Sequence, residues 1–281
     1  MRRKGGTAEI VPCRYGASRL TFRGPARVVV GGHVAALGGS ETFGANVALP
    51  WPELLERRIG VPVVNLGAAH AGIDALAADE AVLAIARTAR LVVVQITGAH
   101  LLSNGLYSLH ARRNDRVIRQ TDALRRLYPR TDFSGHVFVR HMLKALHAES
   151  PRRFSAVRDE LQSLWPARML ALCAALGRPA VLLWMGSRPP DDGGDAVEGD
   201  PLFVTRAMLD TVRRGTAGLA EVWDDPFGRR DLRGQVHADG TTRARNALPG
   251  ADLHDRAADA LAGVVAPILA REDAMGVQRA G

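Results

Sequence analysis

The chain has 281 residues, 47% of them hydrophobic, and its mean hydropathy of −0.04 is typical of a globular protein. Its 37 Lys and Arg against 29 Asp and Glu give a net charge of +8, which is compatible with binding to nucleic acid, an anionic membrane or an anionic small substrate. No apolar stretch approaches the roughly 20 residues of a membrane helix. No nucleic-acid-binding motif is evident either. We therefore expect neither a membrane span nor a nucleic-acid partner.

The two cysteines, Cys13 and Cys173, are far apart and have no metal-ligand spacing. They predict reduced thiols in a cytoplasmic protein. The basic start of the chain is not followed by an apolar segment, so a secretory signal is not expected. His141 and His147 lack the glutamate of a zinc-binding helix, and no phosphate-binding loop follows the first strand. No metal and no organic cofactor are predicted.

The first half of the chain alternates short apolar runs with helical patterns. Residues 1–25 are expected to form an irregular arm. Strands are predicted at 27–30, 33–37, 61–66 and 91–96, and helices at 51–59 and 73–89.

The second half begins with a polar and basic stretch, 100–150, which predicts an insertion or lid after the third strand of the sheet. Helices are expected at 154–176, 204–214 and 255–270, strands at 179–185 and 220–223, and mobile or polar loops at 191–200 and before Pro249. Alternating strands and helices predict a mostly parallel sheet with helices on both faces. The fold class is therefore a three-layer α/β/α architecture, organised as a single domain over 1–281.

One turn carries a candidate nucleophile. The predicted strand at 33–37 is followed by Gly38-Gly39-Ser40-Glu41-Thr42-Phe43-Gly44, which places Ser40 at the start of a helix. The glycines allow a sharp turn, and the following amides can stabilise an anion. The simpler interpretation is a serine that caps the helix. The stretch resembles the first block of the SGNH (GDSL-type) hydrolases, Gly-Asp-Ser-x-Thr-x-Gly, with Gly39 in the position of the aspartate.

Three later segments resemble further SGNH blocks in the same chain order: residues 65–72, residues 98–104 and residues 248–254. The resemblance implies Ser40 as nucleophile and His254 as base, oriented by Asp252 or by a backbone carbonyl. It implies a backbone donor to the oxyanion at Gly67 or Gly72. The accompanying side-chain donor would be His100 or Asn104. His254 could otherwise be a surface histidine or a helix cap.

A basic stretch after the third strand, Tyr107 to Arg116, contains a candidate anion clamp. Arg112 and Arg113 could hold a carboxylate, phosphate or sulfate of a substrate, or else form a solvated basic face. Glu41 and Thr42, which follow the serine, are assigned to substrate contact.

The resemblance implies a flavodoxin-like fold of the SGNH type, closest to a bacterial family of SGNH-like domains with Gly-Gly-Ser/Thr-Glu-Thr and Arg-Arg-Asn-Asp-Arg stretches. The expected activity is that of a serine hydrolase or acyltransferase. Its substrate would be an ester, such as an O-acyl group on a carbohydrate-like or anionic molecule. The alternative is a non-catalytic anion- or glycan-binding module that retains the fold. The oligomeric state stays open.

Overall fold

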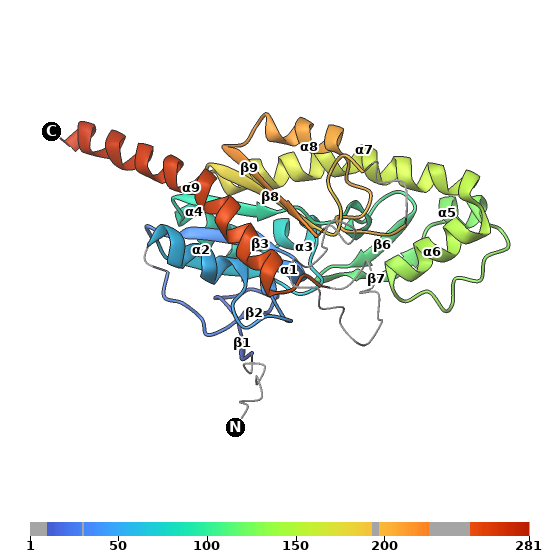
Figure 1. Cartoon of the computed structure of the whole chain (residues 1–281). Helices are drawn as coiled ribbons and strands as arrows, with labels where there is room; N and C mark the ends of the chain where they lie inside the picture. Colours follow the sequence, from blue (N-terminus) through green and yellow to red (C-terminus); the bar gives the residue numbers. More distant parts are fainter. Residues whose placement is uncertain (1–9, 30, 193–196, 225–247, 281) are drawn as a thin grey trace, which may run out of the picture.

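A five-stranded parallel sheet forms the centre of the computed structural model, which describes residues 10–29, 31–192, 197–224 and 248–280 (Figure 1). Each strand pairs with its neighbours in parallel, in the order β4-β3-β5-β8-β9. The strands are β3 (Val34–Gly38), β4 (Val63–Gly67), β5 (Leu91–Gln95), β8 (Ala180–Gly186) and β9 (Gly218–Trp223). In this order the chain changes direction between β3 and β5, and open α/β sheets bind ligands at such a switch point.

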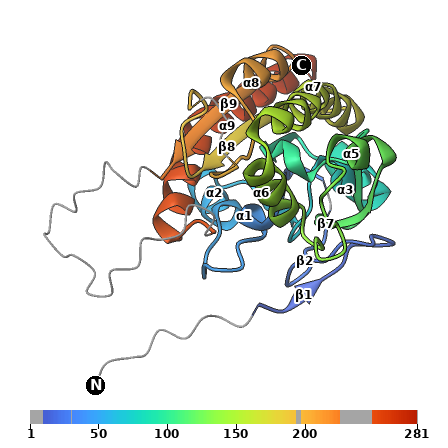
Figure 2. The same ribbon diagram turned by 90° about the vertical axis from the view of Figure 1, so that its right-hand side faces the viewer.

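Helices cover both faces of the sheet, as Figure 2 shows. The helices of one face are α2 (Trp51–Ile59) and α9 (Ala251–Ala280), and those of the other include α3 (Ile73–Ala77), α4 (Glu80–Thr88), α7 (Pro151–Leu176) and α8 (Arg206–Arg213). Successive strand side chains point to opposite faces. Val34 and Ala36 accordingly pack with α2 and α9, whereas Ala35 and Leu37 pack with the other helices. The predicted three-layer α/β/α fold is confirmed.

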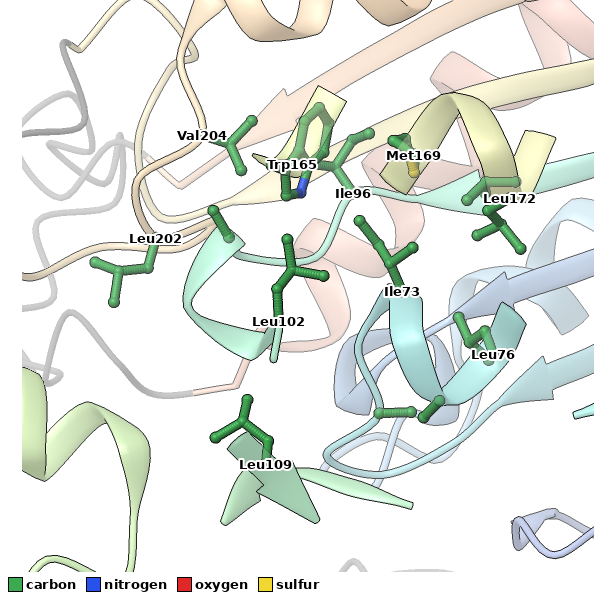
Figure 3. Packing of buried hydrophobic residues seen from close by; sticks show 14 of the residues in the cluster. Ile73, Leu76, Ile96, Leu102, Leu109, Trp165, Met169, Leu172, Leu202 and Val204 are labelled. Carbon is green, nitrogen blue, oxygen red and sulfur yellow. The ribbon is translucent and has the colours of Figure 1, made fainter. Parts of the chain in front are cut away.

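The larger of the two cores reaches the ends of the strands. Trp165 of α7 is fully buried beside Ile96, Leu102 and Val204, and its indole N–H donates to the carbonyl of Thr97 at 3.0 Å (Figure 3). Burying a side chain of this kind stabilises the fold by about 1.5–3 kcal/mol. The long helix is therefore anchored on the segment that follows β5.

The predicted insertion contains regular structure. It holds the short helix η1 (Ala99–Leu101), the hairpin β6 (Tyr107–His110) and β7 (Arg113–Gln120), and the helices α5 (Asp122–Leu127) and α6 (Val139–Glu149). Asn114 is 1% exposed and ties the hairpin to α3, because its Oδ1 accepts from the backbone N–H groups of Gly72 and Ala75. Its function as a lid stays a prediction.

The described residues 10–25 differ from the expectation of an irregular arm over 1–25, and residues 1–9 lie outside the described residues. The strands β1 (Pro12–Cys13) and β2 (Phe22–Arg23) form an antiparallel hairpin, and Phe22 forms a β-bridge with Ala68 beyond β4. The strand expected at 27–30 is absent at 27–29, where Val28 is 87% exposed and has no neighbouring strand to pair with; residue 30 lies outside the described residues.

The helix expected at 73–89 is two helices, α3 and α4. Asp79 interrupts it, because its side chain accepts from the Val82 N–H and caps the second helix. The remaining predicted strands and helices are confirmed with boundaries shifted by a few residues, except that the last helix, expected at 255–270, extends over Ala251–Ala280. Parts of the loops expected at 191–200 and before Pro249 lie outside the described residues. None of the helices in the described part of the chain is long and apolar enough to cross a membrane.

Candidate active site

Ser40 is the first residue of the short helix α1 (Ser40–Phe43), which follows β3 after one residue and lies at the switch point of the sheet. The turn requires glycine before it, because a Cβ on Gly38 would lie 2.1 Å from Thr42 Oγ1. The N-cap position of α1 is occupied by Gly39, so Ser40 does not cap the helix. Ser40 lines a cavity of about 430 Å³ together with residues that follow β5 and with the start of α6.

The Ser40 hydroxyl is held by a backbone amide. Its Oγ accepts a hydrogen bond of 3.0 Å from the N–H of His70, whose φ of 62° is unusual for a residue other than glycine. The amides of Gly67 and Gly72 instead donate to the side chains of Asn65 and Asn114, at 2.9 and 2.8 Å. The backbone donor beside Ser40 is thus His70, rather than the glycines that sequence reasoning selected.

The side chain of His70 lines the same cavity and meets a carboxylate. Its Nδ1 lies 3.4 Å from Oδ2 of Asp115, and Asp115 also lines the cavity. Arg113 contacts the same carboxylate oxygen through Nη2 at 3.2 Å. An alcohol, an imidazole and a carboxylate therefore border one cavity. The sequence pattern did not single out His70 and Asp115, because His70 lies in a segment that predicts a backbone amide donor and Asp115 in one that predicts a basic clamp.

Glu41 is the second acidic group of the cavity. Its Oε2 accepts from Gln95 Nε2 at 2.9 Å. Burial raises the pKa of Glu41, and the charge of Asp200 raises it further, while Arg140 opposes both effects more weakly. Arg140 and Asp200, which also line the cavity, form an ion pair at 2.5 Å. Glu41 therefore retains its proton to a higher pH than an exposed glutamate, and it could exchange a proton with a bound molecule.

His100 is the sequence-predicted donor that the fold brings to the cavity. It is 5% exposed, and its Nδ1 makes no hydrogen bond with the described residues. Burial, and then the nearby charge of Arg140, hold the pKa of His100 well below its usual value. The ring is consequently neutral, with one nitrogen that carries a proton and one that does not.

His254 and Asp252 do not border this cavity. His254 is 1% exposed in the first turn of α9, and its Nδ1 accepts from the backbone N–H of Trp51 at 3.1 Å. Burial and the charge of Arg23 lower the pKa of His254 to about 4. In a neutral ring whose Nδ1 accepts, Nε2 carries the proton and cannot take another. No hydrogen bond joins Ser40 to His254 in the described part of the chain.

Three other predicted residues have structural contacts. Asp252 is exposed, 3.7 Å from Arg256 through its Oδ2. Asn104 closes a turn, since its Oδ1 accepts from the N–H groups of residues 106 and 107. Thr42 is fully buried and donates to Gln95 Oε1 at 2.7 Å.

Arg112 and Arg113 line a different cavity, which shares His70 with the first. Among the residues placed in the structure, no group of three or more His, Cys, Asp and Glu is arranged to hold a metal ion.

Comparison with solved structures found a lipase from a goat rumen metagenome that is 12% identical. The match covers 83% of this chain and 97% of the lipase chain, with a TM-score of 0.42. A protein from Lactobacillus plantarum is 15% identical over 84% of this chain and 97% of its own, with a TM-score of 0.38. A search of the curated proteins found no match. A family model with the description "Domain of unknown function (DUF6473)" matches residues 1–269, and the chain therefore belongs to this family.

Proposed function

We propose that the protein is an SGNH-like serine hydrolase or acyltransferase that acts on an ester, such as an O-acyl group of a carbohydrate-like or anionic molecule. The observation that carries this proposal is the position of Ser40. Its hydroxyl lies at the switch point of a parallel sheet, borders a cavity of about 430 Å³, and is bound by a backbone N–H. Nucleophilic serines of α/β enzymes commonly occupy such a turn between a strand and a helix.

A serine hydroxyl needs a base, and the contacts favour His70 with Asp115 for this role. Both line the cavity of Ser40, and the His70 ring is 3.4 Å from the carboxylate that would orient it. The Oγ of Ser40 would bond to the acyl carbon while its proton passes to the ring. The ring would return that proton to the departing alcohol. Water or a second alcohol would then take the acyl group from the serine.

The developing oxyanion would need donors on the same side of the cavity. The N–H of Ser40 itself and the N–H of His70 are suitable, and neutral His100 could add a ring N–H. The other predicted donors, Gly67 and Asn104, already have partners within their own turns.

The sequence-predicted pair, Ser40 with His254, stays the alternative base assignment. It requires the His254 ring to release the Trp51 N–H and to expose an unprotonated nitrogen toward Ser40. The same hydrogen bond favours a second function for the chain, a non-catalytic anion- or glycan-binding module. A protein that has lost catalysis could retain the cavity while His254 serves only to fix α2 against α9.

Labelling with a fluorophosphonate probe, followed by peptide mass spectrometry, tests the proposal. We expect label on Ser40 of the wild type and none on Ser40→Ala. His70→Asn should label at least about 100-fold more slowly, since removing a general base costs this much or more, and His254→Asn should label at the rate of the wild type.

Circular dichroism of both histidine variants checks that each remains folded. If only His254→Asn labelled slowly, while His70→Asn labelled at the rate of the wild type, His254 would be the general base. A wild type that neither labels nor cleaves aryl esters would support the binding module instead.

A further inference from the structure

A second cavity adjoins the first and carries positive charge. It measures about 370 Å³ and lies between the N-terminal hairpin, the loop after β4 and the turn from β6 to β7. Its ionisable lining consists of Arg19, His70, His110, Arg112 and Arg113. None of the described residues that line it is Asp or Glu. Three arginines thus line one cavity whose described lining residues include no carboxylate.

The turn between β6 and β7 fixes the direction of several donors. His110 Nδ1 accepts from the backbone N–H groups of Arg112 and Arg113, at 3.3 and 3.2 Å. A neutral His110 ring therefore carries its proton on Nε2, which can donate. Asp115 contacts Arg113 through Nη2 of the guanidinium at 3.2 Å, and Nε of that arginine is buried without a hydrogen-bond partner among the described residues. The positive charge of the cluster is only partly neutralised.

The ligand that best matches the arginines of the second cavity is a tetrahedral dianion. A carboxylate needs one guanidinium fork, whereas a phosphate monoester offers three acceptor oxygens and nearly two negative charges to several arginines. His70 lines both cavities, so the two cavities adjoin at this residue and one extended molecule could reach both. Arg19 and His110 line the same cavity as Arg112 and Arg113, so they extend the anion clamp that was expected from the sequence.

We infer that the second cavity binds the phosphate group of the substrate, so that the substrate is a phosphorylated molecule whose ester lies beside Ser40. This inference rests on the proposed function for its ester, but the phosphate site itself can be tested without turnover. The N-terminal hairpin is then part of the site, because it contributes Arg19.

Isothermal titration calorimetry at low ionic strength tests the site. The unreactive Ser40→Ala protein is titrated with glucose 6-phosphate, glucose and inorganic phosphate. We expect glucose 6-phosphate to bind, glucose to show no binding, and inorganic phosphate to bind more weakly than the sugar phosphate. Arg112→Gln and Arg19→Gln, both at exposed positions, should each weaken the binding of glucose 6-phosphate at least tenfold. Arg119→Gln is the matched control, since it removes the same charge from an exposed position of the same hairpin.

Equal weakening by Arg119→Gln and Arg112→Gln would overturn the inference, because it would indicate only the general positive field of the protein. Inorganic phosphate that binds as tightly as glucose 6-phosphate would also overturn it, in favour of a site for the free ion. Failure of the proposed function is a separate result: it appears as a wild type that the fluorophosphonate probe does not label, whatever the titrations give.

Discussion

Protonation of the buried His254 should make the folded protein sensitive to acid. The pKa of this ring is lowered to about 4 from its ordinary value of 6.5, chiefly by burial. In the unfolded chain the ring binds a proton below pH of about 6.5, whereas in the folded protein it does so only near pH 4. The unfolded state therefore gains protons first as the pH falls. The contribution of His254 to stability is complete above pH of about 6.5 and declines as the pH falls toward 4.

The size of this effect follows from the two pKa values. A difference of one in pKa corresponds to about 1.4 kcal/mol, so the complete effect is about 3 kcal/mol, and about 2 kcal/mol of it is lost between pH 7 and pH 4.5. The variant His254→Asn keeps an acceptor near the Trp51 N–H but cannot titrate. Its free energy of unfolding should therefore fall by about 2 kcal/mol less than that of the wild type over this interval.

Urea unfolding at pH 7.0 and pH 4.5, followed by circular dichroism, measures the difference. Carboxylates that titrate in the same range are present in both proteins and cancel in the comparison. His141→Asn, at an exposed position, controls for the loss of one imidazole. If His254→Asn and the wild type lose the same stability to within about 0.5 kcal/mol, the reasoning that His254 is a buried neutral ring is refuted.

Two further substitutions test the turn that holds Ser40. Gly38→Ala places a methyl group 2.1 Å from Thr42 Oγ1 and 2.4 Å from Gln95 Oε1. It should destabilise the protein by about 1–3 kcal/mol. Thermal unfolding should show a lower melting temperature for Gly38→Ala. The control Gly135→Ala should melt at the temperature of the wild type, because a Cβ at that position meets nothing within 4 Å. Thr42→Val keeps the shape but leaves the Gln95 carbonyl oxygen without its 2.7 Å donor, and urea unfolding should report a loss of about 1–3 kcal/mol. A loss under about 0.3 kcal/mol would contradict the assignment of Thr42 as a structural residue.

The sequence alone predicted the layers of the fold because their pattern is local. The strands β3, β4, β5 and β8 are mostly apolar, with Asn65 in β4 and Gln95 at the end of β5, as expected of strands covered on both faces, and every residue in them is buried. Glycine at position 38 marked the turn into α1, where no side chain fits. These features depend on residue size and polarity within short segments, so they can be read without knowledge of distant neighbours.

The tertiary structure alone decided the contents of the site. Burial raises the pKa of Glu41, and the charge of Asp200, which is far from it along the chain, raises that pKa further. Likewise, the backbone N–H of Trp51 donates to the His254 ring, which the order of the motifs had assigned as the base for Ser40. Protonation and hydrogen bonding depend on which groups meet within a few ångströms, and spacing along the chain does not fix those meetings. The sequence therefore determined where the candidate serine lies, and the packing of distant segments determined which groups surround it.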